Sequence, residues 1–412
     1  MISFHQAIKI ILEAIIPVDA ENCPLGSLHG RVLAQEVAAP IDVPPFDNSA
    51  MDGFAICSED AAGARPDRPV SLRLLAEIAA GDAATAPLLK GSTFRILTGA
   101  PIPPGADAVI EQERVEFADG QILLKEPVPF GRNVRSRGED ATKGASVLLQ
   151  GDVLDAARVG IIASVGIGAL QVHRIPRVAI LTTGNELVEV NQPLKGGQIH
   201  DSNSFTLQGL VREAGCEPVL VGPASDSLED LKKRIRTGLS ADALITAGGV
   251  SMGTRDMVLQ AFRETDVDVL FWKVNIKPGM PFAFGLYRPP GALRPVPVFA
   301  LPGNPVSAMV TFLQLARPAL RILMGSREGL VGTNLKAKLE HDYSKLDGKL
   351  HFARGIVRNE NGKLVVRITG SQSSGVLTSL SLANCLVVIP ETEHLMKAGS
   401  EVEVRLTREV AM

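Results

Sequence analysis

Short apolar runs alternate with helix-length segments between residues 177 and 324, and this alternation strongly limits the folds open to the chain. The run 178–181 is continuously apolar, which is typical of a strand that is buried on both faces. Helical patterns cover 203–214, 227–239 and 306–324, and strand-like runs lie between them. This order of elements predicts a parallel α/β sheet covered by helices.

The remaining sequence predicts further domains, because a chain of 412 residues is too long for one hydrophobic core. Residues 1–13 have apolar positions at helical spacing, and residues 156–165 are also expected to be helical. Residues 44–144 are rich in glycine, proline and short β-like runs, which favours a β-rich domain. Strand-like runs return after residue 332 and predict a small β-barrel or sandwich.

Composition excludes several classes of protein. The net charge of −3 gives no basic surface for nucleic acid or anionic membranes, and no apolar run reaches membrane-spanning length. The N-terminus lacks the basic region of a signal peptide. The four cysteines are scattered without a C-x-x-C pair, so we expect neither a zinc site nor disulfides, and a reducing compartment, the cytoplasm, fits best.

Three loops follow strands of the expected sheet, where open α/β sheets bind ligands. Residues 182–186 (TTGNE) place Glu186 after a tight turn, although a helix N-cap box would have the same pattern. Residues 247–253 (AGGVSMG) allow the backbone to approach a phosphate or pterin closely, and a plain glycine-rich turn is the alternative. Residues 301–305 (LPGNP) either direct a helix N-terminus at an anion or form a structural turn.

Three further segments carry charge in unusual places. Residues 273–282 (KVNIKPGMPF) are mostly apolar, and Lys277 is placed to hold an oxyanion, whereas Lys273 is equally well explained as a surface residue. Residues 46–55 place Asp47 and Asp52 on a turn, where both also suit turn formation. Residues 135–140 (RSRGED) mix cations and acids, which is common in surface ion pairs. Together these patterns indicate an enzyme for a phosphorylated substrate, with a metal ion or oxyanion nearby.

Other familiar catalytic patterns are missing from the sequence. Gly166-Ile-Gly168 is not a dinucleotide fingerprint, and no Walker lysine, H-E-x-x-H or G-x-S-x-G motif occurs. The seven histidines are scattered, so none is nominated as a catalyst. We expect His200 and His351 to be structural or surface residues.

Taken in order, the motifs resemble those of one family, the molybdopterin molybdenumtransferases, or MoeA-type molybdenum insertases. Each motif alone is a weak signal, but the ordered set spans nearly the whole chain. The set comprises DNSAMDG (47–53), TGAP (98–101), RGED (137–140), TGNE (183–186), GGVSMG (248–253), KPGMPF (277–282) and LPGNPVS (301–307).

The resemblance implies a four-domain MoeA-like fold. Its parts are an elongated segmented domain (1–45 and 141–174), an inserted β-rich domain (46–140), a three-layer α/β molybdopterin-binding domain (175–327) and a C-terminal β-barrel (328–412). It also implies a homodimer whose active cleft lies between the α/β domain of one subunit and the inserted domain of the other.

The activity implied by the resemblance is insertion of molybdate into adenylylated molybdopterin, with release of AMP and with Mg²⁺ as cofactor. A separate molybdopterin adenylyltransferase would supply the substrate, and apo-molybdoenzymes would receive the product. Two other hypotheses remain: a nucleotide pyrophosphatase built on the same α/β module, and a non-catalytic dimeric scaffold.

Site residues also follow from the resemblance, by motif position. The acids of the cleft would be Asp52, Asp140, Glu186 and Asp226, of which Glu186 and Asp226 would bind Mg²⁺. Molybdopterin and adenylate would contact Thr98, Thr183, Gly184, Gly248, Gly249, Ser251, Asp256, Pro302, Gly303 and Asn304. Molybdate would contact Lys273, Lys277, Pro281, Ser307, Arg354 and Ser374.

Two positions depart from the family pattern. Met280 stands where family members often have lysine, and Val376 stands where some have arginine. Fewer cations mean weaker oxyanion binding unless Arg354 and the lysines compensate. The choice between molybdate and tungstate stays open, because the two oxyanions match in charge and shape.

Overall fold

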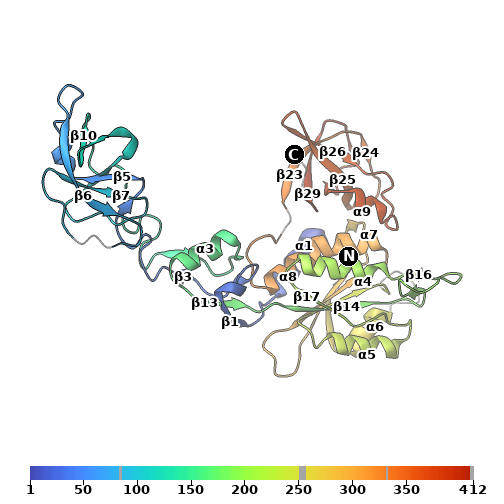
Figure 1. The fold of residues 1–412 in the computed structure, drawn as a ribbon. Helices are drawn as coiled ribbons and strands as arrows, with labels where there is room; N and C mark the ends of the chain where they lie inside the picture. The colour runs from blue at the N-terminus through green and yellow to red at the C-terminus, as the bar shows by residue number, and fades with distance from the viewer. Residues whose placement is uncertain (83–85, 250–256, 331–332, 409–412) are drawn as a thin grey trace.

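The computed structural model describes residues 1–82, 86–249, 257–330 and 333–408. Its parts follow the expected MoeA-like plan (Figure 1). A β-rich domain at one end is joined by a slender segmented domain to an α/β domain, beside which lies the C-terminal barrel.

The segmented domain combines stretches from both sides of the inserted domain. Its sheet has the order β1-β13-β2, so a strand from beyond the insertion lies between two strands that precede it. Helix α3 begins after Asp155, whose side chain caps it. The elements are β1 (Ala20–Pro24), η1 (Leu25–Ser27), β2 (Val32–Leu33), β3 (Val37–Ala38), β12 (Ser146–Leu148), α3 (Ala156–Ser164) and β13 (Ala169–His173). Helix α1 (Phe4–Ala14), which precedes them, packs its buried face into the core of the α/β domain.

The inserted domain is built on a six-stranded sheet in the order β8-β5-β7-β6-β10-β9. A separate two-stranded ladder joins β4 to β11 and supports the turn that carries Asp52. The elements are β4 (Asn48–Ser49), β5 (Gly53–Ile56), α2 (Ser58–Ala61), β6 (Val70–Ile78), β7 (Ser92–Ile96), β8 (Ala108–Glu111), η2 (Gln112–Arg114), β9 (Glu116–Ala118), β10 (Gln121–Leu124) and β11 (Val134–Arg135).

The α/β domain has a six-stranded sheet in the order β17-β14-β18-β22-β21-β19. The first four strands in this order are parallel, as the apolar runs predict, and β21 and β19 add an antiparallel edge. The strands are β14 (Arg177–Thr182), β17 (Glu217–Leu220), β18 (Ala243–Ala247), β19 (Val267–Trp272), β21 (Ala283–Tyr287) and β22 (Val296–Leu301), with a small ladder of β15 (Leu187–Val188) and β16 (Ile199–His200).

Helices cover both faces of this sheet, which makes three layers. Val178 and Ile180 of β14 pack in the core beneath α4 (Ser202–Glu213), whereas Ala179 and Leu181 pack in the core beneath α5 (Leu228–Gly238) and α6 (Met257–Glu264). Alternate side chains of a strand point to opposite faces, so a strand such as β14 that is covered on both faces requires a continuous apolar run.

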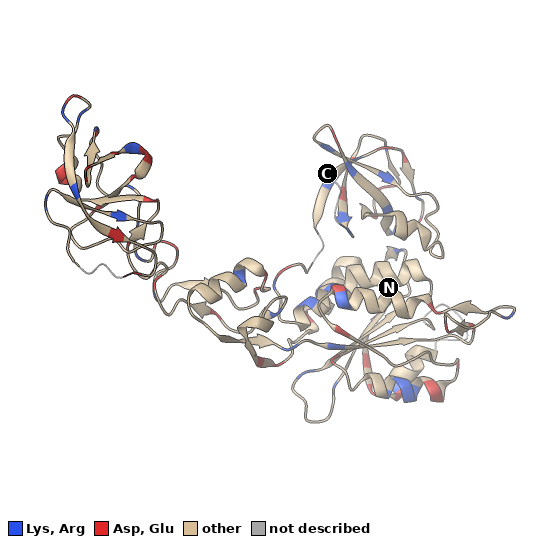
Figure 2. Cartoon of the chain, viewed as in Figure 1, with Lys and Arg blue, Asp and Glu red and all other residues tan. Residues whose placement is uncertain are grey.

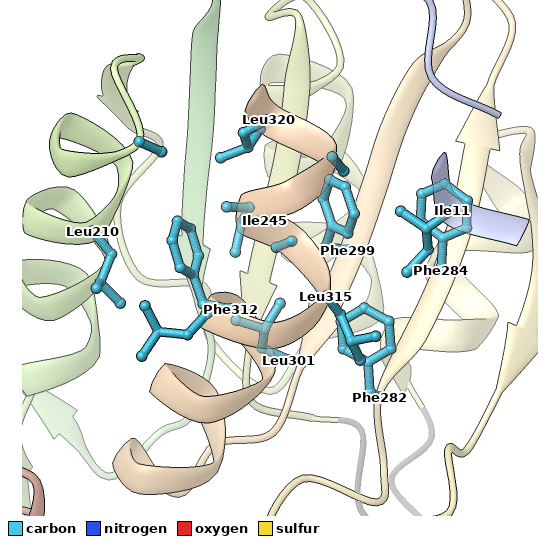
Figure 3. Close-up of a cluster of buried hydrophobic side chains, with 14 of the residues drawn as sticks. Ile11, Leu210, Ile245, Phe282, Phe284, Phe299, Leu301, Phe312, Leu315 and Leu320 are labelled. Carbon is cyan, nitrogen blue, oxygen red and sulfur yellow. The ribbon is translucent and has the colours of Figure 1, made fainter. Parts of the chain in front are cut away.

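A long core helix lies beside α4 on the same face of the sheet. It runs through α7 (Pro305–Thr311), a π-helical turn η3 (Phe312–Ala316) and α8 (Arg317–Leu323), with Asn304 as N-cap. Figure 3 shows Phe312, Leu315 and Leu320 of this helix among the phenylalanines and aliphatic residues of the sheet. The stretch Pro305–Leu323, contrary to expectation, is long and apolar enough to span a membrane by composition, but 78% of an 18-residue window within it is buried inside the protein.

The C-terminal domain is a closed barrel, so of the two folds expected from the sequence, a barrel or a sandwich, the barrel is the one observed. Its five strands have the order β25-β26-β23-β29-β27, and β27 pairs back with β25. The elements are β23 (Asn334–Leu339), β24 (Tyr343–Ser344), β25 (Leu350–Glu360), β26 (Lys363–Ile368), α9 (Thr378–Leu382), β27 (Cys385–Ile389), β28 (Leu395–Met396) and β29 (Glu401–Leu406).

One strand of the α/β domain also pairs with this barrel. β20 (Ile276–Lys277) lies parallel to the start of β25, with Lys277 opposite His351. The turn that carries Lys277 is therefore held against the barrel by backbone pairing.

Candidate functional site

A cavity of about 1070 Å³ opens at the carboxyl ends of the parallel strands, between the α/β domain and a loop of the barrel. The loops after β14, β18 and β22 all reach it, together with the start of α4 and the turn after β20. Of the residues nominated from the sequence, those lining the cavity are Thr183, Gly184, Glu186, Asp226, Gly248, Gly249, Lys277, Pro281, Pro302, Gly303, Asn304, Ser307 and Ser374.

Backbone hydrogen bonds join the three loops into one floor. The Thr183 N–H donates to the Ala247 carbonyl at 3.1 Å, and the Gly248 N–H donates to the Leu301 carbonyl at 3.1 Å. Gly248 has φ of 109°, and a Cβ there would lie 2.5 Å from the Thr183 carbonyl oxygen. Only glycine permits this approach, so the packing of the loops alone explains its presence.

The first loop does not start a helix. Residues after β14 turn directly into β15, so the alternative of a helix N-cap box at 182–186 is not realised. The Glu186 carboxylate folds back over Gly184, where an added Cβ would lie 2.5 Å and 2.6 Å from its two oxygens. This contact directs the carboxylate over the loop at the edge of the cavity.

Asp226 is brought to the same side of the cavity by a reciprocal pair of contacts. Its N–H donates to the Asn185 side-chain oxygen at 3.0 Å, and the Asn185 N–H donates to the Asp226 carboxylate at 3.5 Å. The two carboxylates nominated for a metal, Glu186 and Asp226, therefore lie on loops that are hydrogen-bonded to each other.

The donor set suits a cation that also binds the substrate. Among the described residues there is no group of three or more His, Cys, Asp or Glu side chains that would hold a metal alone. Mg²⁺ commonly takes one or two carboxylates and fills its remaining positions with phosphate oxygens and water. Glu186 and Asp226 fit that pattern.

The start of α7 and the barrel loop 371–375 form another part of the cavity lining. Asn304 donates from its side chain to the Ser374 hydroxyl at 2.9 Å, and the Val306 N–H donates to the Ser374 carbonyl at 3.3 Å. Ser307, in the first turn of α7, also lines the cavity. The start of a helix favours a nearby anion through its dipole, although Pro305 has no N–H and the Val306 N–H is bonded to Ser374.

The two nominated lysines have different positions. Lys277 lines the cavity, and its Nζ lies 3.0 Å from the Asp347 carboxylate. Lys273 is not among the lining residues, and its Nζ lies 3.8 Å from the centroid of the Trp272 ring.

Arg354 lies behind the cavity wall. Its side chain is only 1% exposed, and the guanidinium donates to the carbonyls of Ser371 and Ser373 and to the Ser379 hydroxyl at 3.0–3.1 Å. Burial lowers the pKa of the Arg354 guanidinium, which nevertheless stays charged at neutral pH. Arg354 therefore fixes the loop that presents Ser374.

The nominated residues of the inserted domain do not reach the cavity of their own chain. Thr98 donates through its N–H at 2.8 Å and its hydroxyl at 2.7 Å to one oxygen of Asp52, and these hydrogen bonds hold the pKa of Asp52 below its ordinary value. Asp140 lies near the base of this domain, where its N–H donates to the Val43 carbonyl at 2.9 Å. Figure 2 shows the inserted domain far from the α/β domain. Ser251 and Asp256 lie outside the described residues.

Several cavity residues are not nominated from the sequence. Asn203, Lys349 and Gln372 line the cavity, and so does His200, which is exposed, in agreement with the expected structural or surface role. Asp201 caps α4, and the Asn203 side chain donates to the Gly303 carbonyl at 2.7 Å. Lys349 and Gln372 belong to barrel loops without a motif, so only the fold reveals them.

Comparison with known proteins decides the family. The sequence matches the models of the MoeA N-terminal region (domains I and II) over residues 2–166, a probable molybdopterin binding domain over 179–322 and the MoeA C-terminal region (domain IV) over 336–407. A molybdopterin molybdenumtransferase of Haemophilus influenzae is 37% identical over 408 residues, which cover 98% of each chain.

The chain belongs to the MoeA family of molybdopterin molybdenumtransferases. A Mycobacterium tuberculosis relative, molybdopterin molybdenumtransferase 2, is 36% identical over 97% of this chain and 98% of its own. The crystal structure of a molybdopterin biosynthesis MoeA protein from Pyrococcus horikoshii OT3 superposes with a TM-score of 0.85 at 32% identity, covering 98% of this chain and all of that one. This MoeA-family chain is thus a transferase of molybdenum cofactor biosynthesis.

Proposed function

We propose that this chain inserts molybdate into adenylylated molybdopterin and releases AMP, with Mg²⁺ as cofactor. The observation that carries the proposal is the cavity itself, whose lining combines two carboxylates with a helix start and a lysine. The substrate has a pyrophosphate-type linkage and meets a second anion, molybdate. A site for both must therefore offset negative charge in two places.

The two carboxylates of the cavity lining serve the phosphate linkage of the substrate. Glu186 and Asp226 would hold Mg²⁺ from their hydrogen-bonded loops, and the bound cation would neutralise charge that develops on the phosphate oxygens as AMP leaves. Gly248 and Gly249 keep the floor open so that the substrate lies close to the backbone.

A second group of lining residues serves the oxyanion. Lys277, Ser307 and Ser374 belong to it, and the positive end of the helix that begins at Pro305 adds to their effect. Arg354 contributes by holding the loop of Ser374, through its hydrogen bonds to that loop. Lys273 adds positive charge from beside Trp272.

We further propose that the site is completed by a second copy of the chain. Asp52, Thr98 and Asp140 lie on or beside a domain that does not reach the cavity of its own chain. A homodimer in which the Asp52 turn enters the partner's cavity would add a carboxylate whose lowered pKa keeps it ionised. The enzyme would act in the cytoplasm, between a separate molybdopterin adenylyltransferase and apo-molybdoenzymes.

The test is AMP release from adenylylated molybdopterin with Mg²⁺, measured with and without molybdate. We expect release that requires molybdate and that yields a product able to activate an apo-molybdoenzyme. Release that ignores molybdate would indicate a nucleotide pyrophosphatase, and absence of release would indicate a scaffold.

A matched pair of variants locates the activity. Glu186→Gln removes the charge that faces the cavity, so AMP release should fall by about a hundredfold or more. Glu189→Gln is the control, because Glu189 is an exposed acid on the following turn that does not line the cavity. Equal activity of the two variants would contradict the assignment of Glu186.

A further inference from the structure

A chain of hydrogen bonds leads from the barrel to the cavity lysine. The Tyr343 hydroxyl lies 2.8 Å from Nδ1 of His351, and Nε2 of His351 lies 2.7 Å from one oxygen of Asp347. The other oxygen of Asp347 accepts from Nζ of Lys277 at 3.0 Å. Tyr343, His351 and Asp347 belong to the barrel, whereas Lys277 belongs to the α/β domain.

The hydrogen bonds from Tyr343 to Lys277 require a neutral His351 and an ionised Asp347. A neutral His351 donates a hydrogen bond from Nε2 to Asp347, and its Nδ1 accepts a hydrogen bond from the Tyr343 hydroxyl. Burial lowers the pKa of His351 despite the opposing effect of Asp347, which favours the neutral ring. Burial alone would raise the pKa of Asp347, but hydrogen bonds from Lys277 and His351 outweigh it and keep the carboxyl ionised. Lys345 also faces this pair and adds positive charge.

The backbone around these side chains is fixed from both domains. β20 pairs with β25 so that Lys277 lies opposite His351. Asn275 donates from its side chain to the Gly348 carbonyl at 3.2 Å, and its own carbonyl accepts from the Leu350 N–H at 3.2 Å. The turn that carries Asp347 thus cannot move without breaking the contact between the two domains.

We propose that Asp347, oriented by His351 and Tyr343, is a positioning residue that holds the Lys277 ammonium at the cavity for the oxyanion. This inference rests on the proposed function, in which Lys277 binds molybdate. Asp347 is not a lining residue, so it acts through the lysine.

The physical reason lies in the character of lysine. An ammonium has three donors on a flexible four-carbon stem, and Lys277 is half-exposed, with 54% of its side chain accessible. One donor directed at Asp347 fixes the stem and leaves two donors for an oxyanion. Ordering the side chain before binding removes an entropic cost that would otherwise weaken the anion site. The barrel thereby contributes to oxyanion affinity through a residue that does not touch the anion.

The experiment is a double-mutant cycle on the full chain. Asp347→Ala, Lys277→Ala and the double variant are compared with the unchanged chain in AMP release at varied molybdate concentration. We expect Asp347→Ala to raise the molybdate concentration for half-maximal release by about tenfold, with little change in the KM for adenylylated molybdopterin. In the Lys277→Ala background the same change should have no further effect.

Three additional proteins keep the result interpretable. Tyr343→Phe removes only the far end of the chain of hydrogen bonds and should raise the same molybdate concentration by about two- to threefold, even if Asp347→Ala fails to fold. Asp347→Asn keeps an acceptor for Lys277 and should restore part of the loss. Asp342→Ala is the control, because Asp342 is a barrel acid whose partner is Lys397 and which does not line the cavity.

The outcomes separate the two proposals. Molybdate-dependent release that is unchanged in Asp347→Ala and Tyr343→Phe, or effects that add fully to that of Lys277→Ala, would overturn the positioning role while leaving the insertase intact. Release that is independent of molybdate in the unchanged chain would overturn the proposed function, and with it the oxyanion role of Lys277.

Discussion

Replacement of Arg354 by alanine separates a supporting role from a direct contact with the oxyanion. The side chain is 1% exposed and makes three hydrogen bonds, two of them to carbonyls of the loop that presents Ser374. A buried acceptor that loses its partner costs about 1–3 kcal/mol. The loop lies at the surface and can rehydrate its carbonyls, so we take the lower end for each bond and expect a total of about 3 kcal/mol.

This free energy should appear as local opening of the loop. A loss of about 3 kcal/mol corresponds to roughly a hundredfold increase in the population of open states. Hydrogen exchange followed by mass spectrometry should show that increase in peptides covering 371–380, with unchanged exchange in the inserted domain. Arg358→Ala is the control on the same strand, because Arg358 is a partly exposed residue that pairs with Glu340 and Glu360 and does not line the cavity.

The result that refutes this reasoning is specific. If Arg354→Ala leaves exchange in 371–380 unchanged but weakens molybdate binding, the guanidinium contacts the oxyanion directly and the loop does not depend on it. Hydrogen exchange of residues 371–380 in Arg354→Lys should lie between that of the unchanged chain and that of Arg354→Ala, since lysine keeps the charge but loses the planar guanidinium.

Three further predictions test other parts of the structure. Gly53→Ala should destabilise the inserted domain by about 2–3 kcal/mol in thermal unfolding, because a Cβ would lie 2.0 Å from the Ile110 carbonyl oxygen, whereas Gly63→Ala has open space and should change little. Asp242→Asn should cost about 3 kcal/mol at pH 7, since the carboxylate is buried between two guanidiniums. Burial would raise the pKa of Asp242, but its hydrogen bonds lower it overall, so this stability is present above the ordinary carboxyl pKa and is lost as pH falls through the lowered value. Unfolding followed below about pH 4 should therefore show the gap between the two proteins closing. Chelation of Mg²⁺ should reduce AMP release by at least about tenfold and readdition should restore it, and activity that persists in chelator would exclude a metal role.

The sequence is informative where local pattern decides the structure. Continuous apolar runs require strands buried on both faces, and the rule for open sheets then brings the loops after β14, β18 and β22 together. The helix start follows from Pro305 at the first helical position, whereas the Asn304 side chain donates to Ser374 instead of capping the helix.

Features that depend on distant pairing are not visible in the sequence. Closure of the barrel requires β27 to return to β25, and no local pattern separates this from a sandwich. Arg354 has the sequence signature of a polar residue in a strand, and only the fold shows that it is buried behind a loop. His351 is buried and hydrogen-bonded, in agreement with the expected structural or surface role, but only the parallel pairing with β20 shows that it lies opposite Lys277.

Complementation between two inactive chains tests the central claim most directly, namely that the cavity of one chain works with the Asp52 turn of another. Asp52→Ala and Glu186→Gln chains with different tags are coexpressed, and the mixed dimer is isolated. The account predicts that each variant alone is inactive and that the mixed dimer recovers about half the molybdate-dependent AMP release, because one of its two sites is intact. A mixed dimer as inactive as its parents would contradict a site shared between two copies.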